Sequence, residues 1–302
     1  MLQIPPEMLT WRRTPYLREL ENTYEAGRFL DTGMTFVTEK QILDGKLSRF
    51  KLLIVPAASH IRAEVVASIL RFVDQGGNLF MLPSSFLSDE YNRPAPYLSD
   101  MGVRVRRIEQ VAADRTGELE QGYDQTYHER VVFRPSKVQP LSTRGVGLFA
   151  KSRPDLQVEG TRQDISLAEA YDLLAVFPDD QPALVSFSRG RGRIYYSATS
   201  FPRRSLGLLL DLLFEAAAVS RPVRVRGEHG EALWNVEARF VGDTAGKLLY
   251  IVNFNDNPVS ARIEMTDGRP RGFYDLRKQE KLVGNLLRVL PGETSILRLD
   301  RP

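Results

Sequence analysis

The residues best suited to chemistry lie in one short polar segment that follows an apolar run. Residues 83–93 read PSSFLSDEYNR and combine two acids, one arginine, one amide and several hydroxyls. One interpretation is a polar contact surface for a sugar or a neighbouring domain, because functional residues concentrate on loops. The other is a solvated loop whose side chains make local turn hydrogen bonds. The candidate contact residues of this 84–93 loop are Ser84, Ser85, Asp89, Glu90, Asn92 and Arg93.

A serine nucleophile is a second possibility at the start of this loop. Ser84 or Ser85 would attack, and His60, after the neighbouring strand, would be the base. A nucleophile elbow requires small residues on both sides of the serine because its turn is tight. Here Leu82-Pro83 and Phe86-Leu87 flank the serines, so the pattern gives a catalytic triad little support and favours His60 as an ordinary polar residue.

The remaining candidate residues favour structural roles. His128 lies in the least patterned stretch, and His229 lies in a turn. Residues 188–193 read SRGRGR, but a phosphate-binding glycine loop must open a helix, and this one joins two strands. Trp11 and Trp234 could stack on sugars, although core packing is the default for tryptophan. Glycoside hydrolysis needs two facing carboxylates, and the sequence nominates no such pair.

Composition excludes several classes of protein. The 302 residues include no cysteine and three histidines, so thiol catalysis, disulfides and multi-histidine metal sites are not expected, and no cofactor is predicted. Lys and Arg number 41 against 38 Asp and Glu, a net charge of +3, which lacks the basic excess of a nucleic-acid binder. No apolar run is long enough for a membrane span, and the first residues lack a signal-peptide core. These features predict a soluble, cytoplasmic protein.

The first part of the chain has the pattern of an α/β domain. Apolar runs at 50–56 and 78–83 flank an amphipathic stretch that begins near Ser59 and ends at Gly76-Gly77, which predicts a strand–helix–strand unit. In an open sheet of this kind, ligands bind beyond the carboxyl ends of the strands, where the 84–93 loop lies. Further expected elements are a helix at 15–31, strands at 34–37 and 103–108, a hairpin of strands at 183–187 and 192–197, and a helix at 205–219.

Helix patterns end at Arg221-Pro222. Short alternating segments separated by Gly, Asn, Asp and Pro follow, which is typical of an antiparallel β-sandwich. We therefore expect two domains, an α/β domain at 1–222 and a β-sandwich at 223–302. The expected strands of the second domain are 223–225, 234–241, 247–254, 260–265, 272–275, 286–289 and 294–299.

A series of segments along the chain forms a recognisable pattern. It includes the DTG turn after the first helix, the KLLIVPA strand, the helix closing on GG, and the DEYNRP loop. It continues through GRGRIYYSATS and an apolar helix to LLRVLPGETSILRL. In this pattern the chain resembles the C-terminal part of glycoside hydrolase family 42 β-galactosidases. The resemblance implies a doubly wound, mostly parallel sheet like that of class I glutamine amidotransferases and flavodoxin, followed by a small antiparallel β-sandwich. In that family the α/β domain is called the trimerisation domain.

The resemblance also implies which functions this chain lacks. The family's catalytic glutamates lie on a preceding (β/α)₈ barrel, which takes about 250 residues, so no catalytic residue carries over to this sequence. Amidotransferase chemistry needs a cysteine nucleophile, and there is none. The leading interpretation is a non-catalytic oligomerisation and accessory module of a β-galactosidase-like enzyme. Its partners would be a catalytic barrel in a parent chain and further copies of itself as a trimer, with carbohydrate a further candidate.

The alternative function is a stand-alone hydrolase or sugar-binding protein that uses the 84–93 loop. The chain start is expected to be a cut through a longer protein, with Met1–Ile4 as the stub of an interior strand, because Pro5-Pro6 cannot extend a ladder.

Overall fold

The computed structural model describes residues 15–111, 131–134, 138–168, 170–242, 247–267, 272–282 and 284–299. The chain divides into two compact units. Unit 1 contains the described residues up to Thr23 together with Phe36–Val219, and unit 2 contains Tyr24–Thr35 with the described part of Ser220–Pro302. The expected stub at Met1–Ile4, Trp11 and His128 lie outside the described residues.

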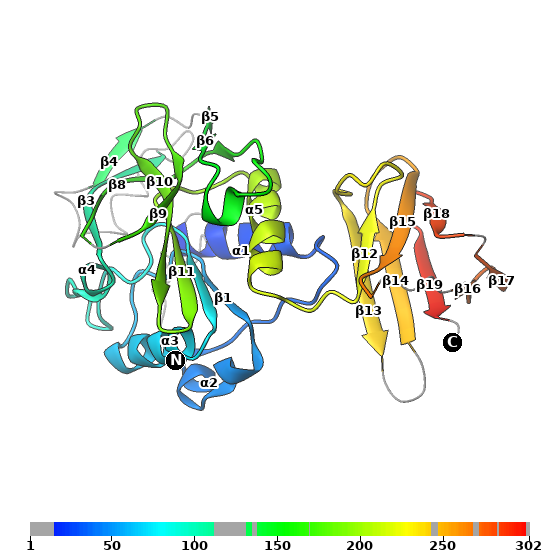
Figure 1. Cartoon of the computed structure of the whole chain (residues 1–302), viewed down its shortest axis with the longest axis horizontal. Helices are drawn as coiled ribbons and strands as arrows, with labels where there is room; N and C mark the ends of the chain where they lie inside the picture. The colour runs from blue at the N-terminus through cyan, green and yellow to red at the C-terminus, as the bar shows by residue number, and fades with distance from the viewer. Residues whose placement is uncertain are drawn as a thin grey trace, which may run out of the picture. The chain divides into compact units, whose positions relative to one another are not determined.

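Unit 1 is built on a six-stranded sheet with the order β1-β2-β11-β10-β9-β6 (Figure 1). Its strands are β1 (Leu52–Val55), β2 (Asn78–Met81), β6 (Ser142–Thr143), β9 (Asp172–Val176), β10 (Pro182–Arg189) and β11 (Gly192–Ser197). Only the β1–β2 and β2–β11 pairs are parallel, and the other three pairs are antiparallel. The prediction of a mostly parallel sheet was therefore wrong for the described strands: the sheet is mixed, because β11 is reached by a hairpin from β10 rather than by a helical crossover.

The strand–helix–strand unit at the sheet edge is present as predicted. Between β1 and β2 the chain forms α3 (Ala63–Asp74), which packs against β2 and β11. The buried side of α3 repeats at helical spacing, and the chain turns at Gly76, whose φ of 106° suits glycine. The side chains of this buried face are Val65, Val66, Ile69, Phe72 and Val73.

Short elements complete unit 1. The helices are α1 (Pro15–Gly27), whose last residues belong to unit 2, α2 (Glu39–Leu43), α4 (Tyr97–Asp100) and α5 (Arg203–Ala216), with 3₁₀ turns η3 (Lys46–Arg49) and η5 (Gly147–Phe149). A second sheet has the order β4-β3-β8 and comprises β3 (Val103–Val111), β4 (Val131–Arg134) and β8 (Arg162–Leu167). A third sheet pairs β5 (Gln139–Pro140) with β7 (Gln157–Val158).

Unit 2 contains two antiparallel sheets that share one hydrophobic core. One has the order β12-β15-β18 and the other β13-β14-β19-β16-β17. Core residues come from both sheets, for example Val225 and Ile263 from the first and Ile251 and Leu297 from the second. The antiparallel β-sandwich expected for this part of the chain is therefore present. The strands are β12 (Val223–Arg226), β13 (Val236–Gly242), β14 (Lys247–Asn253), β15 (Val259–Met265), β16 (Phe273–Asp275), β17 (Glu280–Lys281), β18 (Leu286–Val289) and β19 (Thr294–Leu299).

Three local expectations differ from the structure. No strand forms at 34–37, and the first helix ends at Gly27 rather than near residue 31. The helix expected to begin near Ser59 begins at Ala63 instead, and Arg62 rather than Ser59 holds its N-cap position, without a side-chain cap. The reason is that residues 58–61 are still extended and pair with the loop after β2. Within the described residues, no helix is both long and apolar enough to cross a membrane.

Candidate functional site at the carboxyl edge of the sheet

The 84–93 loop begins as a continuation of the parallel pairing beyond β1 and β2. The Phe86 amide donates to the Ala58 carbonyl at 2.8 Å, and the Ser88 amide donates to the Ser59 carbonyl at 2.9 Å. The Ile61 amide then donates to the Ser88 carbonyl at 3.1 Å. The loop therefore stands on hydrogen-bonded backbone at the carboxyl ends of the two strands.

The first turn of the loop is held in a conformation that ordinary residues avoid. Ser84 has a φ of 65° and Phe86 a φ of 61°, which costs about 1–2 kcal/mol for each residue with a Cβ. Between them Ser85 is fully buried, and its hydroxyl donates to the carbonyls of Val55 (3.1 Å) and Leu82 (2.8 Å). The Ser85 hydroxyl thus stabilises the strained turn and points to backbone rather than to a substrate.

The second turn of the loop is closed by Asp89. Its amide donates to the Arg93 carbonyl at 2.9 Å, and its Oδ1 accepts from the amides of Tyr91 and Arg93, both at 2.9 Å. Asn92 takes a φ of 62° inside this turn. This is the local turn-forming role of aspartate, so the solvated-loop interpretation applies to the Asp89 side chain.

The outer surface of the loop is formed by the side chains that the turn does not use. Tyr91 is 69% exposed, and the Arg93 guanidinium lies 5.1 Å from the centroid of its ring. Glu90 and Asn92 are also exposed. Tyrosine and arginine are enriched in protein interfaces, where they supply contact area and hydrogen bonds.

His60 joins the loop through a side-chain relay. Its Nδ1 lies 2.8 Å from the Ser59 hydroxyl, and its Nε2 lies 2.6 Å from Asn92 Oδ1. Both contacts suit the neutral tautomer with the proton on Nε2, in which Nδ1 accepts from the serine. The relay has the order of nucleophile, base and orienting group, but the serine is Ser59 and not Ser84 or Ser85. Sequence reasoning missed Ser59 and Tyr91 because both look like ordinary loop residues until the backbone pairing is known.

Negative charge gathers beside the loop. The Arg62 Nε contacts Glu39 Oε2 at 2.8 Å, and its Nη1 contacts Glu64 Oε1 at 3.3 Å. The hydrogen bond that Arg62 donates to Glu39 raises the pKa of Arg62 above its ordinary value, and the charges of nearby acids including Glu90 add to this. Partial burial, followed by the charge of Glu90, raises the pKa of the Tyr97 phenol.

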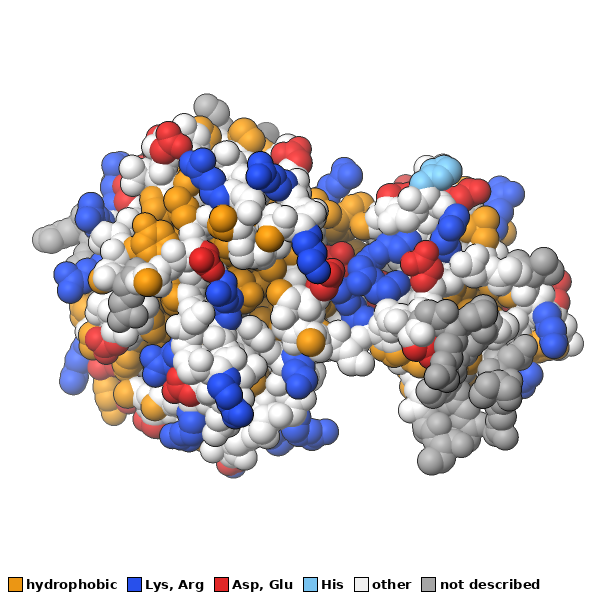
Figure 2. Space-filling model, viewed as in Figure 1, with side chains coloured by type: hydrophobic (Ala, Val, Ile, Leu, Met, Phe, Trp, Pro, Cys, Tyr) orange, Lys and Arg blue, Asp and Glu red, His pale blue; other side chains and the backbone are white. Residues whose placement is uncertain are grey.

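The other sequence candidates stay apart from this site. Residues 188–193 form the β10–β11 hairpin with Gly190 in its turn, as predicted. His229 lies in an exposed turn and Trp234 is half-buried, both in unit 2. In the described ranges, no three histidine or acidic side chains gather closely enough to hold a metal ion. Figure 2 shows basic and acidic side chains interspersed over the visible face, in keeping with the small net charge.

The fold and this edge define a class of protein: a mixed α/β domain that carries a hydrogen-bonded polar loop, joined to a small β-sandwich. Residues 6–220 match the family model described as the β-galactosidase trimerisation domain. The chain belongs to this family. No curated protein has a sequence that matches the chain significantly.

Solved structures of similar fold include β-galactosidases of glycoside hydrolase family 42. Gan42B from G. stearothermophilus has a TM-score of 0.71 at 19% identity, over 96% of this chain and 37% of its own. The enzyme from Bacillus circulans sp. alkalophilus has a TM-score of 0.69 at 19% identity, over 95% and 38%. The enzyme from Rahnella sp. R3 has a TM-score of 0.71 at 16% identity, over 94% and 37%. The chain thus spans little more than a third of the length of these enzymes.

Proposed function

We propose that this chain is a non-catalytic oligomerisation and accessory module of a β-galactosidase-like glycoside hydrolase. The observation that carries the proposal is the match of residues 6–220 to the β-galactosidase trimerisation domain. In this proposal the α/β unit associates with further copies as a trimer, and the catalytic barrel belongs to a longer parent chain. β-Galactoside cleavage is then the activity of the whole enzyme.

The 84–93 loop is the proposed contact element of the module. Its backbone is fixed to the strands below it, so presenting Tyr91 and Arg93 to a neighbouring subunit or domain orders few additional groups. Low ordering cost favours binding, because immobilising flexible side chains and loops subtracts from affinity. Asn92 and Glu90 would supply polar contacts at the rim of this surface.

The proposed architecture has a domain boundary at Pro222 and a glutamine-amidotransferase-like arrangement in the first domain. The β1–α3–β2 unit and the parallel position of β11 beside β2 support this arrangement. The absence of cysteine from the sequence leaves the domain without that fold's thiol chemistry.

The test of the module is the mass of the purified chain in solution, measured by sedimentation equilibrium or light scattering. We expect a trimer, and we expect Tyr91→Ala combined with Arg93→Ala to weaken it. Tyr171→Ala combined with Arg104→Ala is the matched control, because both of these side chains are exposed outside the loop. A monomer at every concentration would overturn the self-association of this chain, and equal effects of both double variants would overturn the role of the loop.

The alternative, an independent hydrolase, is favoured by one observation, the Ser59–His60–Asn92 relay. An activity assay separates it from the module. We expect the purified chain to leave chromogenic galactosides and esters uncleaved. Galactoside turnover that is lost on mutation of one acid, or ester turnover that is lost in Ser59→Ala, would establish the alternative instead.

A further inference from the structure

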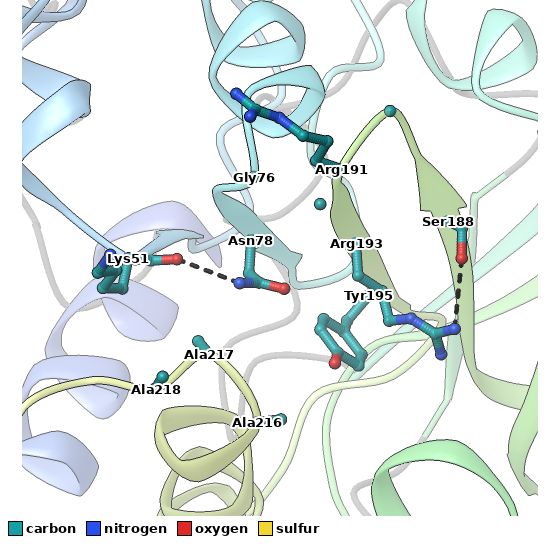
Figure 3. A pocket seen from close by; sticks show the side chains of 12 residues that line it. Lys51, Gly76, Asn78, Ser188, Arg191, Arg193, Tyr195, Ala216, Ala217 and Ala218 are labelled. Atoms are coloured by element: carbon teal, nitrogen blue, oxygen red, sulfur yellow. Dashed lines mark hydrogen bonds between the residues drawn. The ribbon is translucent and has the colours of Figure 1, made fainter.

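A second polar feature of unit 1 lies at the other edge of the sheet. A pocket of about 520 Å³ opens where β2 and β11 begin and α5 ends (Figure 3). This volume lies within the range of small-molecule sites. The pocket is lined by Lys51, Gly76, Asn78, Ser188, Gly190, Arg191, Gly192, Arg193, Tyr195 and Ala216 to Ala218.

The lining contains three basic side chains and no acidic one. Two acids lie close by, but each is engaged by an arginine. Asp74 is held by Arg189, with Nε to Oδ1 at 3.0 Å, and Asp172 is held by Arg193, with Nη1 to Oδ2 at 2.6 Å. Figure 3 shows the Arg193 guanidinium directed along the sheet towards Ser188 rather than into the pocket.

Lys51 and Arg191 are the two cations left for a ligand. Both are exposed, and among the residues that the structure describes neither has an acidic partner. They come from different elements: Lys51 precedes β1, and Arg191 lies in the β10–β11 turn. Both line the same pocket, with Arg191 on its Gly76 side (Figure 3), and long, exposed ammonium and guanidinium side chains suit an oxyanion, since Lys and Arg are the residues that bind phosphate.

The opposite wall of the pocket offers acceptors and hydroxyls. The backbone amides just after α5 donate to carbonyls of the helix itself: the Ala217 amide to the Leu213 carbonyl, and the Ala218 amide to the Glu215 carbonyl. No hydrogen bond from a described residue reaches the Ala216 carbonyl, one of the orphan acceptors at the end of the helix. The Tyr195 ring points towards this end of α5, and the Asn78 amide lies across the pocket from Tyr195 (Figure 3).

We infer that this pocket binds a phosphate monoester of a polyol, that is, a sugar phosphate. The phosphate contacts Lys51 and Arg191, and the sugar hydroxyls contact the Ala216 carbonyl, the Asn78 amide and the Tyr195 hydroxyl. Because the pocket is separate from the 84–93 loop, this inference stands or falls independently of the proposed oligomerisation.

Calorimetric titration of the purified chain with glucose 6-phosphate and galactose 6-phosphate tests the inference, with inorganic phosphate and glucose as separate arms. We expect at least one sugar phosphate to bind with a Kd below about 1 mM, more tightly than inorganic phosphate, and glucose not to bind. Lys51→Gln and Arg191→Gln should each weaken binding about fivefold, as expected for loss of one exposed charge contact. Lys46→Gln and Arg104→Gln, exposed cations outside the pocket, should bind as the parent does.

Four results would contradict the inference. The first is no binding of either ester up to about 10 mM. The second is equal affinity for inorganic phosphate and the esters, which would show that the sugar hydroxyls contribute nothing to binding. The third is unchanged binding in both pocket variants when circular dichroism shows that they are folded. If Arg191→Gln changed only the stability of the chain, Arg191 would serve the nearby end of α3, and this too would contradict its role in binding.

Discussion

Gly192→Ala probes the close packing of the β10–β11 hairpin against the end of α3. The Arg191 amide donates to the Asp74 carbonyl at 3.1 Å, which brings the start of β11 onto the helix end. A Cβ at position 192 would lie 2.0 Å from the Gly77 carbonyl oxygen and 2.4 Å from that of Val73. Real Cβ contacts essentially never fall below 3.0 Å, so backbone must move by roughly 1 Å at two places.

The cost can be worked out from this geometry. Forced overpacking costs about 1–3 kcal/mol. Moving β11 away from Gly77 also weakens the adjacent backbone pairing of Arg193 with Asn78, at about 1 kcal/mol for each hydrogen bond lost. We expect Gly192→Ala to lower the free energy of unfolding by about 2–4 kcal/mol, a large part of the roughly 5–15 kcal/mol typical of a domain.

Urea unfolding followed by circular dichroism at the helix band measures this loss, because α2, α3, α4 and α5 all belong to unit 1. Gly45→Ala is the matched control in the same unit. Gly45 has a φ of 80° but open space around it, so only the backbone strain of about 1–2 kcal/mol applies. If Gly192→Ala cost no more than Gly45→Ala, the close approach of the hairpin to the helix would be refuted.

Three further predictions concern buried polar groups. Ser85→Ala removes a hydroxyl that the Leu82 carbonyl and the Val55 carbonyl accept from, leaving the Val55 carbonyl with the Leu82 amide, and should cost about 1–3 kcal/mol. Ser99→Ala, at an exposed position, should cost less than about 1 kcal/mol, and equal costs in urea unfolding would contradict the role of Ser85. Tyr196→Phe removes the 2.5 Å bond to Gln163 Oε1 and should cost about 1–3 kcal/mol at pH 7. Burial raises the pKa of Tyr196 above its ordinary 10.0, so the stability it contributes is present below pH 10 and lost above it; the cost of the variant should therefore shrink as unfolding is measured above pH 10, and a constant cost would refute this. Burial also raises the pKa of Glu19 above its ordinary 4.5, so folding is favoured by the protonated carboxyl below pH 4.5 and loses this contribution as pH rises above it. Glu19→Gln should therefore raise the urea midpoint relative to the parent more at pH 7 than at pH 4, and a midpoint at pH 7 below that of the parent would refute this.

Elements with a repeating apolar pattern could be predicted from the sequence. The runs at 50–56 and 78–83 became β1 and β2, and the stripe between them became α3, because burial on both faces of a strand or one face of a helix leaves a clear signature. The β10–β11 hairpin and the strands of the sandwich followed from alternation and turn residues in the same way.

Strand direction and loop geometry could not be predicted in this way. A buried strand reads as apolar whether its neighbour is parallel or antiparallel, so the pattern alone did not reveal that the sheet is mixed. No strand was expected at 172–176, so β9 and its antiparallel pairing with β10 were missed altogether. Ser59 has the residue type of an N-cap, but the Ser88 amide donates to the Ser59 carbonyl and keeps this segment extended. The hydrogen bonds that keep Ser59 extended are tertiary and join residues about 30 positions apart in the chain.

The strained turn at the start of the 84–93 loop has a physical purpose under the proposed function. Backbone strain persists only where the surrounding structure enforces it, and it concentrates at functional sites. Here Ser84 and Phe86 carry the strain, and the buried Ser85 hydroxyl holds the turn in place, so none of the three presents a reactive group to solvent. What the turn fixes is the path of the chain to Tyr91 and Arg93. Under the proposed function, a geometry that would aim a nucleophile in a hydrolase instead aims a contact surface, and the strain is offset when that surface meets a neighbour without further ordering.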